Sequence, residues 1–595
     1  MPWDKLTGTT FHTAIITGCH KLIRHKQALN KINVFPVADG DTGDNLSSTC
    51  MAVIYFSSVK ADLRGTLESI ADASIIGARG NSGIIFSQFF NLLAKHVPPK
   101  EELHFNDFSK IMVQVGQEIA RVVTNPVPGT MITLIQKWAS LCEINQSSSL
   151  FAQTMVDLLP LLSLEVEQTK QLLNILQKAN VVDAGALGFY YFIEGFTQFL
   201  QQSHTADTVN IDLPLSTIEH LPLSCATTEY RYCTEAVLKS LSIDKNKLLH
   251  FLKEQGDCAS VTGNERITRF HVHTNNPREV FTGLYQHYTI QYPKVDDMLR
   301  QHELQFGKKY KIGLVTDSSA DLPQDLIDEY QIHQIPLNIH VDEHHLLDKH
   351  CFEANYFYKQ LNSFKTHPKT SCLNPTLLEE KLAKIASHYD HVLVLSISSK
   401  MSGTYDAFLT ATQKYANITV LDTKTNSGAH GLLLHYAGQL IASGNDIDTI
   451  TKLLSKAIKN TYIFVMVNQF ESMIRSGRVN KISGRIAQWV NIKPIVSIDS
   501  AGQGIMVGKC FSASRARNKL ITFLQEKKDE AQLILEDYCI IHAGDKNQAL
   551  HLAEITTRAF NKPPAYIESV SLAIGLHAGQ GCVALAGRLR DSNGH

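Results

Sequence analysis

The sequence has no long apolar run and no excess of charge of one sign. No uninterrupted apolar stretch approaches the roughly 18 residues of a membrane-spanning helix, and the 56 Lys and Arg residues nearly balance the 57 Asp and Glu residues. This balance gives no support for a protein whose whole surface is basic and binds nucleic acid. The first residues, MPWDK, lack the charged and then apolar pattern of a secretory signal. We therefore expect a cytoplasmic protein with no nucleic-acid partner and at most peripheral membrane contact.

Several common catalytic and stabilising patterns are also missing. The eleven cysteines are scattered and form no Cys-x-x-Cys pair, so a disulfide framework is not expected. The segment GQGIMVGKC at 502–510 misses the P-loop pattern, because Gln503 takes the place of the first glycine and Cys510 that of Ser or Thr. The protein-kinase motif set and the GxSxG elbow are absent too. A kinase with this sequence would belong to another structural class.

The chain contains three blocks with different hydrophobic periodicities. Its 595 residues, 44% of them apolar, predict roughly three to five globular domains. Residues 1–200 carry apolar residues at helical spacing, and 201–214 resembles a linker. Residues 215–305 mix strands and helices, whereas 309–595 alternate short apolar strands with helices. The predicted fold class is multidomain: an all-α domain, an α+β middle domain and an α/β C-terminal domain with a parallel sheet.

The segment NVFPVADGDTGDN at 33–45 places three carboxylates in one short loop. Asp39, Asp41 and Asp44 would repel one another unless a cation joins them, and Mg²⁺ is commonly held by carboxylates together with substrate phosphates. A solvated turn or a Ca²⁺ loop is the alternative. An EF-hand is disfavoured, because Gly43 stands where an oxygen ligand is expected.

A second glycine-rich turn, GARGNSG at 77–83, comes just before an apolar helix. Its backbone N–H groups and Ser82 would form a phosphate cradle at a helix N-terminus. A helix-capping turn fits the same residues equally well.

Four ordered motifs make the first 200 residues resemble the ATP-binding domain of dihydroxyacetone kinase (the DhaL or DAK2 type), and more closely that of bacterial fatty acid kinases. The motifs are NVFPVADGDTGDN, GARGNSG, PGTMITLI at 128–135 and VVDAGALG at 181–188. The resemblance implies an eight-helix barrel with Mg²⁺ bridging the catalytic Asp39 and Asp41 to the ATP phosphates, and Asp44 nearby as a further catalytic residue and Mg²⁺ ligand. It also implies nucleotide contacts from Asn33, Thr42, Gly43, Asn45, Ser82, Gly83, Thr130, Asp183, Ala184 and Gly185. Two residues depart from the family pattern: Asp44 replaces a usual Thr, and Ala186 replaces a usual glycine.

The middle block contains a Cys-His-His set. His271 and His273 alternate along the expected strand ITRFHVHT and so share one face, while Cys233 lies in the expected strand EYRYCTEAVL. Cys and His ligands with an open position suit Zn²⁺, although packing residues are the alternative. The segments EYRYCTE and FHVHTNNP resemble the middle domain of fatty acid kinase, and this resemblance makes the three residues zinc candidates.

The C-terminal block ends several expected strands in polar residues. KIGLVTDSSADLP at 311–323, HPKTSCLNP at 367–375 and SISSKMSGTY at 396–405 offer hydroxyls and backbone N–H groups that would hold a carboxylate, or would simply cap helices. Together with RSGRVN, NIKPIV and GLHAGQGCVALA they resemble the DegV family of fatty-acid-binding proteins from about residue 310 onward. That resemblance implies a two-lobed α/β domain with an apolar tunnel. It makes Thr370 and Ser402 head-group contacts and Arg478 and His577 their polar neighbours, while Cys372 and Leu373 depart from the usual Gln-Pro.

These resemblances together predict an enzyme that converts ATP and a long-chain fatty acid into an acyl phosphate and ADP. The expected cofactors are ATP and Mg²⁺, with Zn²⁺ as a further candidate. The expected partners are the fatty acid, an acyltransferase that uses acyl phosphate, and a second copy of the chain in a homodimer. Two alternatives remain open: a lipid-binding or regulatory protein with an inactive kinase domain, and a glycerone-type kinase of a small molecule.

Overall fold

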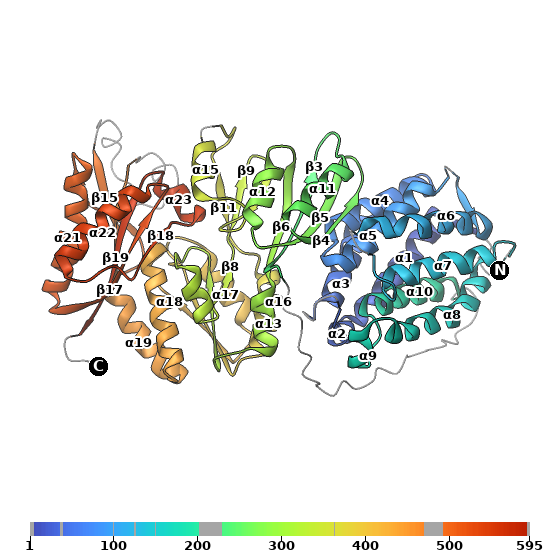
Figure 1. The fold of residues 1–595 in the computed structure, drawn as a ribbon, viewed down its shortest axis with the longest axis horizontal. Coiled ribbons are helices and arrows are strands. Elements are labelled where there is room, and N and C mark those ends of the chain that lie inside the picture. Colours follow the sequence, from blue (N-terminus) through green and yellow to red (C-terminus); the bar gives the residue numbers. More distant parts are fainter. Residues whose placement is uncertain are drawn as a thin grey trace. The chain divides into compact units, whose positions relative to one another are not determined.

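The computed structural model describes residues 5–35, 40–98, 100–123, 126–148, 150–201, 229–361, 363–468 and 492–591. The chain divides into two compact units, Met1–His302 and Glu303–His595, whose elements are labelled in Figure 1. The predicted fold class is confirmed: the chain is multidomain, with a helical N-terminal region, a middle domain that mixes strands and helices, and an α/β C-terminal domain. No helix within the described ranges is both long and apolar enough to cross a membrane.

The helical part of the first unit is built around helix α10, which is buried on all sides. Residues 184–197 are all buried, as expected of a helix that is apolar around its whole circumference. Helix α1 crosses α10 closely, because a Cβ at Gly195 would lie only 2.8 Å from Gly18 Cα. The helices are α1 (Gly8–Arg24), α2 (Lys26–Lys31), α3 (Thr42–Phe56), α4 (Leu63–Gly77), α5 (Gly80–His96), α6 (Phe105–Glu118), α7 (Met131–Ile144), α8 (Phe151–Leu172), α9 (Asn174–Ala179) and α10 (Ala184–Gln201). The pair β1 (Lys5–Thr7) and β2 (Glu102–His104) and the 3₁₀ turn η1 (Ile119–Val122) complete it.

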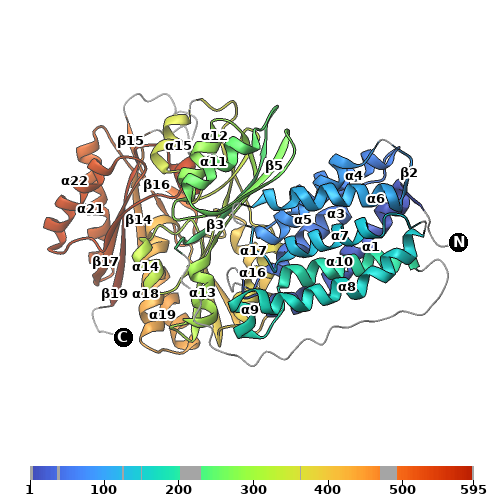
Figure 2. The ribbon, with the colours of Figure 1, turned by 45° about the vertical axis from the view of Figure 1, so that its right-hand side comes forward.

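The middle part of the first unit is a four-stranded antiparallel sheet of order β4-β5-β3-β6. Phe270 on one face packs against Phe281 of α12, whereas Arg269 on the other face donates to the backbone at the end of α4. Helices α11 and α12, and α4 and α5, contact this sheet (Figures 1 and 2). The strands β3 and β5 confirm the two segments expected from the alternation of β-branched and polar residues. The elements are β3 (Tyr232–Lys239), α11 (Lys245–Gln255), β4 (Asp257–Gly263), β5 (Ile267–Thr274), α12 (Pro277–Tyr285), β6 (Thr289–Asp297) and α13 (Met298–Phe306).

The second unit begins with a parallel sheet of order β13-β12-β7-β8, as the strand-helix alternation predicted. The segment between β8 and β12 also forms a small antiparallel sheet, of order β10-β9-β11. The elements are β7 (Ile312–Asp317), α14 (Gln324–Glu329), β8 (His333–Ile335), β9 (Asn338–Val341), β10 (His344–Leu347), α15 (Ala354–Gln360), β11 (Lys369–Ser371), α16 (Pro375–Ala386), β12 (His391–Ser396), α17 (Thr404–Thr412) and β13 (Ile418–Asp422).

A six-stranded mixed sheet of order β16-β15-β14-β19-β17-β18 forms the rest of the second unit. Helices α21 and α22 cover one of its faces and α18 covers the other (Figure 2). The cavity described below lies between this sheet and the segments that follow β12 and β13 of the parallel sheet. The elements are α18 (Ser427–Ala442), α19 (Ile447–Lys459), β14 (Thr461–Met466), β15 (Lys493–Ile498), β16 (Gly504–Cys510), α21 (Ala513–Glu530), β17 (Leu533–His542), α22 (Lys546–Phe560), β18 (Tyr566–Ser569), α23 (Leu572–Ala578) and β19 (Val583–Asp591).

Candidate functional site

The aspartate loop leads directly into helix α3. Asp41 is the N-cap residue of this helix, and its Oδ1 accepts a hydrogen bond of 2.8 Å from Asn45 Nδ2. Buried Asn33 accepts hydrogen bonds from the backbone N–H (3.2 Å) and the hydroxyl of Thr42, which fixes the start of the helix. Asp39, predicted to be a ligand, lies outside the described residues. Asp41 is thus a carboxylate held at the positive end of a helix, where negative charge is favoured.

Asp44 turns toward helix α2. Its Oδ1 lies 2.6 Å from Lys26 Nζ, and its Oδ2 accepts a hydrogen bond of 3.0 Å from Asn30 Nδ2. Gly43 permits this contact between helices, since a Cβ there would lie 2.1 Å from Lys26 O. The carboxylates that are close in sequence therefore differ in their partners, and Asp44 has a cation and an amide of its own.

A cavity of about 260 Å³ brings together predicted nucleotide residues from three distant motifs. Ser82, Thr130, Asp183 and Gly185 all line it, and a Cβ at Gly185 would lie 3.6 Å from Ser82 Oγ. Its lining is Phe35, Asn81, Ser82, Ile85, Val123, Val127, Thr130, Met131, Ile132, Asp183, Gly185, Asp257 and Cys258. Gly83 does not line it but packs against Thr49.

Two lining residues, Asp257 and Cys258, come from strand β4 of the middle domain. No motif pointed to them, because their position depends on the packing of β4 against α5. Cys258 has a left-handed backbone conformation (φ 51°) at an irregularity between β4 and β5. The middle domain therefore forms one wall of the cavity.

Asp183 is an ionisable group in this cavity that its surroundings strongly affect. Burial raises its pKa to about 7, although backbone N–H groups, including that of Ala186 at 2.7 Å from Oδ1, donate to the carboxylate and oppose the rise. A nearby cation would favour the ionised form. The group is therefore poised to change its charge when a cation enters.

The Cys-His-His set of the middle domain forms a compact cluster. Ligand atoms of Cys233, His271 and His273 all lie within 4.8 Å of one another, and Asp257 and Cys258 form a second such group with His273. His271 Nδ1 lies 3.0 Å from Glu235 Oε1, while its Nε2 is buried and has no hydrogen-bond partner among the described residues. A carboxylate on one ring nitrogen and an unsatisfied second nitrogen are common in metal-binding histidines, but the same Nδ1 also lies 3.6 Å from Cys233 Sγ.

The electrostatics of this cluster also fit a cation. Burial raises the pKa of the Cys233 thiol well above its usual value, and the carboxylates of Glu235, Asp296 and Asp41 add to the rise. Burial lowers the pKa of His271. Both side chains are therefore neutral near pH 7, and a thiophilic cation would stabilise the thiolate. The contribution of Asp41 also shows that Asp41 itself lies near the cluster.

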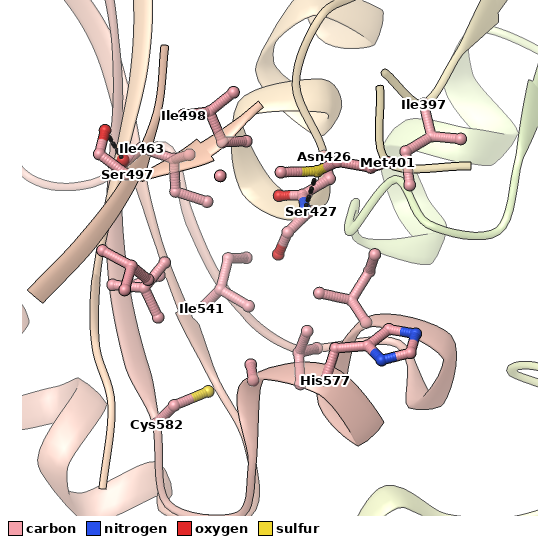
Figure 3. Close-up of a pocket in the computed structure, with 17 residues that line it drawn as sticks. Ile397, Met401, Asn426, Ser427, Ile463, Ser497, Ile498, Ile541, His577 and Cys582 are labelled. Carbon is pink, nitrogen blue, oxygen red and sulfur yellow. Dashed lines mark hydrogen bonds between the residues drawn. The ribbon is translucent and has the colours of Figure 1, made fainter. Parts of the chain in front are cut away.

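The second unit contains an apolar cavity of about 90 Å³. Aliphatic side chains of the six-stranded sheet form one side, and α23 and the start of α18 form the others (Figure 3). The predicted residue His577 projects from α23 at its edge. The lining is Ile397, Met401, Asn426, Ser427, Ile463, Val465, Val496, Ser497, Ile498, Gly504, Ile541, Val570, Ile574, His577, Ala578, Cys582 and Ala584.

Thr370 and Ser402, the predicted head-group contacts, lie outside this lining. Thr370 pairs with Ile339 in the small sheet, and Ser402 Oγ lies 2.8 Å from Thr404 Oγ1. Their segments adjoin, because a Cβ at Gly403 would lie 2.9 Å from Cys372 Sγ. Arg478 lies outside the described residues.

Two buried carboxylates of the aspartate-serine strand end KIGLVTDSSADLP at 311–323 support the rim of the apolar cavity. Asp317 accepts a hydrogen bond of 2.9 Å from the backbone N–H of Ile397, and Asp321 accepts one of 2.8 Å from that of Ser571, which precedes α23. Burial raises the pKa of Asp321 to about 6. The aspartate-serine strand end thus acts here as a support for lining elements.

Three family models match successive parts of the chain. They are the DAK2 domain over residues 36–198, the middle domain of the fatty acid kinase (FakA-like) family over 229–305, and the family described as uncharacterised protein, DegV family, over 311–588.

Curated relatives match about half of the chain. A DegV domain-containing protein of Clostridium acetobutylicum is 27% identical over 278 residues, which are 46% of this chain and 98% of that protein. An uncharacterised protein of Staphylococcus epidermidis is 29% identical over 323 residues, and protein YloV of Bacillus subtilis is 28% identical over 318 residues. Each of these two matches covers 50% of this chain and 56% of the relative, so the chain spans little more than half the length of these relatives.

Solved structures match a similar share. A fatty acid binding DegV family protein of Streptococcus agalactiae is 25% identical, with a TM-score of 0.44, and the match covers 47% of this chain and 100% of that protein. DegV of Bacillus subtilis, described as a fatty acid binding protein, is 24% identical with a TM-score of 0.43 and the same coverage.

Proposed function

We propose that this chain, which joins a DAK2 domain, a fatty acid kinase-like middle domain and a DegV domain, is an ATP-dependent kinase of fatty acid carboxylates. Its own DegV domain would hold the acyl chain. The observation that carries the proposal is the convergence of Ser82, Thr130, Asp183 and Gly185 on one cavity. A separate apolar cavity in the same chain supports an acyl substrate.

The reaction transfers the γ-phosphoryl group of ATP to a carboxylate oxygen. A carboxylic acid is ionised near neutral pH, so the nucleophile needs no general base. A new P–O bond forms to the carboxylate, the bond to the β,γ-bridging oxygen breaks, and ADP leaves with that electron pair. The products are an acyl phosphate and ADP, and we propose that an acyltransferase consumes the reactive acyl phosphate.

The main obstacle is the approach of one anion to another. Asp39 and Asp41, and to a lesser degree Asp44, would hold Mg²⁺, which supplies charge neutralisation at the phosphates when bound. Ser82 and Thr130 would donate hydrogen bonds that orient the phosphates. The apolar lining residues exclude water and so strengthen these polar contacts.

The middle domain adds a second set of donors beside this cavity. Cys233, His271 and His273 would hold Zn²⁺, since their donor atoms converge and His271 has an unsatisfied ring nitrogen among the described residues. Such an ion supplies fixed positive charge next to the aspartate loop.

The lipid end of the reaction rests on the second unit. Thr370 and Ser402 would bind the carboxylate head group, with Arg478 and His577 as polar neighbours. The adjoining segments of Thr370 and Ser402 support a shared site, and His577 also borders the apolar cavity. Linking both domains in one chain raises the effective concentration of bound lipid near the nucleotide.

The test is ADP release by the purified full chain with Mg–ATP, alone or with oleate, palmitate or dihydroxyacetone. The acyl phosphate is trapped with hydroxylamine as a hydroxamate. Turnover that requires a long-chain acid and yields hydroxamate supports the proposal. Lipid binding without turnover would favour a binding protein, and turnover with dihydroxyacetone would favour a small-molecule kinase.

A further inference from the structure

A fully buried carboxylate, Glu235, stands between the Cys-His cluster and the glycine-rich turn at 77–83. Its exposed fraction is 0%, and it lies in strand β3 opposite His271 of β5. A carboxylate is costly to bury unless charges and hydrogen bonds compensate it. Its partners therefore indicate why this position holds an acid.

Glu235 connects to the nucleotide side through a single backbone group. Its Oε1 accepts a hydrogen bond of 2.5 Å from the backbone N–H of Gly80, the first residue of α5. Gly80 has φ +57°, and a Cβ there would lie 2.4 Å from Asn45 Nδ2. Because Asn45 in turn donates to Asp41, one chain of contacts runs from Glu235 to the aspartate loop.

The same carboxylate connects to the Cys-His cluster. Oε1 also lies 3.0 Å from His271 Nδ1, and Oε2 accepts a hydrogen bond of 2.9 Å from Arg269. Arg269 is 2% exposed and donates at 3.3 Å to Ile76 O, close to the end of α4. Lys294 adds positive charge that favours the ionised carboxylate. Glu235 and Arg269 thus hold both sides of the turn between α4 and α5.

We propose that Glu235 is a positioning residue that couples the Cys-His cluster to the nucleotide site. Binding of Zn²⁺ at His271 fixes the ring against Glu235, and Glu235 fixes the Gly80 N–H and hence the turn that carries Ser82. Coupling between two sites is reciprocal, so nucleotide and Zn²⁺ each strengthen the binding of the other. The inference rests on the proposed nucleotide and zinc sites, but not on the identity of the phosphoryl acceptor.

The test measures binding of Mg²⁺ and AMP-PNP to the full chain by titration calorimetry, in zinc-loaded and zinc-stripped protein. Zinc content is measured by mass spectrometry. In the native chain, zinc removal weakens AMP-PNP binding by about fivefold or more, within the usual range of coupling between sites. Glu235→Gln weakens binding to the zinc-loaded chain by about tenfold, as expected when a hydrogen bond loses the charge of its acceptor. In Glu235→Gln, zinc removal then weakens AMP-PNP binding further by less than about twofold.

Thr262→Val is the matched control. Thr262 Oγ1 donates at 3.0 Å to Gln88 Oε1 where β4 packs against α5, the same helix that Glu235 of β3 contacts, but it is not part of the Glu235 network. Thr262→Val should keep the native dependence of AMP-PNP binding on zinc. If Glu235 only held the middle domain against α5, Glu235→Gln and Thr262→Val would lower the AMP-PNP affinity alike. Melting curves report folding. If Glu235→Gln alone unfolds because Arg269 is left unpaired, the double variant with Arg269→Met removes that charge and is measured instead.

Three results would overturn the inference: no stoichiometric zinc, equal AMP-PNP affinity with and without zinc in the native chain, or native coupling in Glu235→Gln. If coupling is present but no hydroxamate forms with any fatty acid, only the proposed function fails.

Discussion

The two cavities of this protein differ in the polar groups that line them. The cavity in the first unit combines apolar side chains with short polar side chains from several separate segments, whereas the cavity in the second unit is lined mostly by aliphatic side chains. A polar site works through the positions of a few atoms, so the loss of one atom is costly. An apolar site works through buried area, so its affinity falls gradually as methylene groups are removed. The two sites should therefore respond differently to equally small changes.

The largest expected effect is that of Asp41→Asn. The change keeps the hydrogen bond with Asn45 possible but removes the charge that would hold Mg²⁺. Turnover should fall by about a thousandfold or more, in line with the size of electrostatic contributions to phosphoryl transfer. Hydroxamate formation measures this fall, and oleate binding measured by calorimetry should be unchanged. Activity within tenfold of the native chain would remove Asp41 from the metal site.

The apolar cavity should instead be broken by a charge. Ile574→Asp places a carboxylate on α23 among aliphatic residues, where an unpaired charge is strongly disfavoured. Oleate affinity should fall by about a hundredfold, while AMP-PNP affinity is unchanged. Ile574→Val is the graded control and should cost only about fourfold, since one methylene contributes about 0.8 kcal/mol. Equal losses in the two variants would show that this cavity does not hold the acyl chain.

The sequence predicted which segments carry the residues of both sites better than it predicted the contacts between those segments. Ser82, Thr130 and Asp183 converge because each lies in a short polar turn at the start of a helix, which is a local pattern. Asp257 lines the same cavity for a non-local reason, the packing of β4 on α5, so no motif marks it. Counting carboxylates in the loop likewise could not show that Asp44 meets a cation of the preceding helix.

The next effect concerns pH and tests the buried carboxylate of the first cavity. Burial raises the folded-state pKa of Asp183 to about 7, from 3.8 for an unperturbed Asp. The folded chain therefore binds more protons than the unfolded chain between these values, and stability falls as the pH rises from about 4 to 7. The loss of stability amounts to a few kcal/mol, because a difference of one pKa unit between the folded and unfolded states corresponds to about 1.4 kcal/mol.

This loss should be absent in Asp183→Asn, which cannot ionise. Melting temperatures at pH 4.5 and pH 7.5 measure the effect as a difference between the two proteins, so that other titrating groups cancel. The native chain should lose more stability than the variant over this interval. Parallel pH profiles would mean that Asp183 titrates normally.

The smallest expected effect tests the loop itself. Asp44→Asn removes a carboxylate that follows Asp41 closely in the sequence, yet its oxygens meet Lys26 and Asn30. More than a third of both side chains in the Lys26 pair is exposed, so the lost ion pair should cost less than about 1 kcal/mol of stability. Turnover should fall by less than about threefold, because Asn keeps an oxygen for Asn30 and the Mg²⁺ charge is balanced mainly at Asp39 and Asp41. The measurement is the steady-state kinetics of Asp44→Asn and Asp41→Asn, compared side by side. If Asp44 is a metal ligand, as its place in the loop predicted, both variants will lose activity to a similar extent.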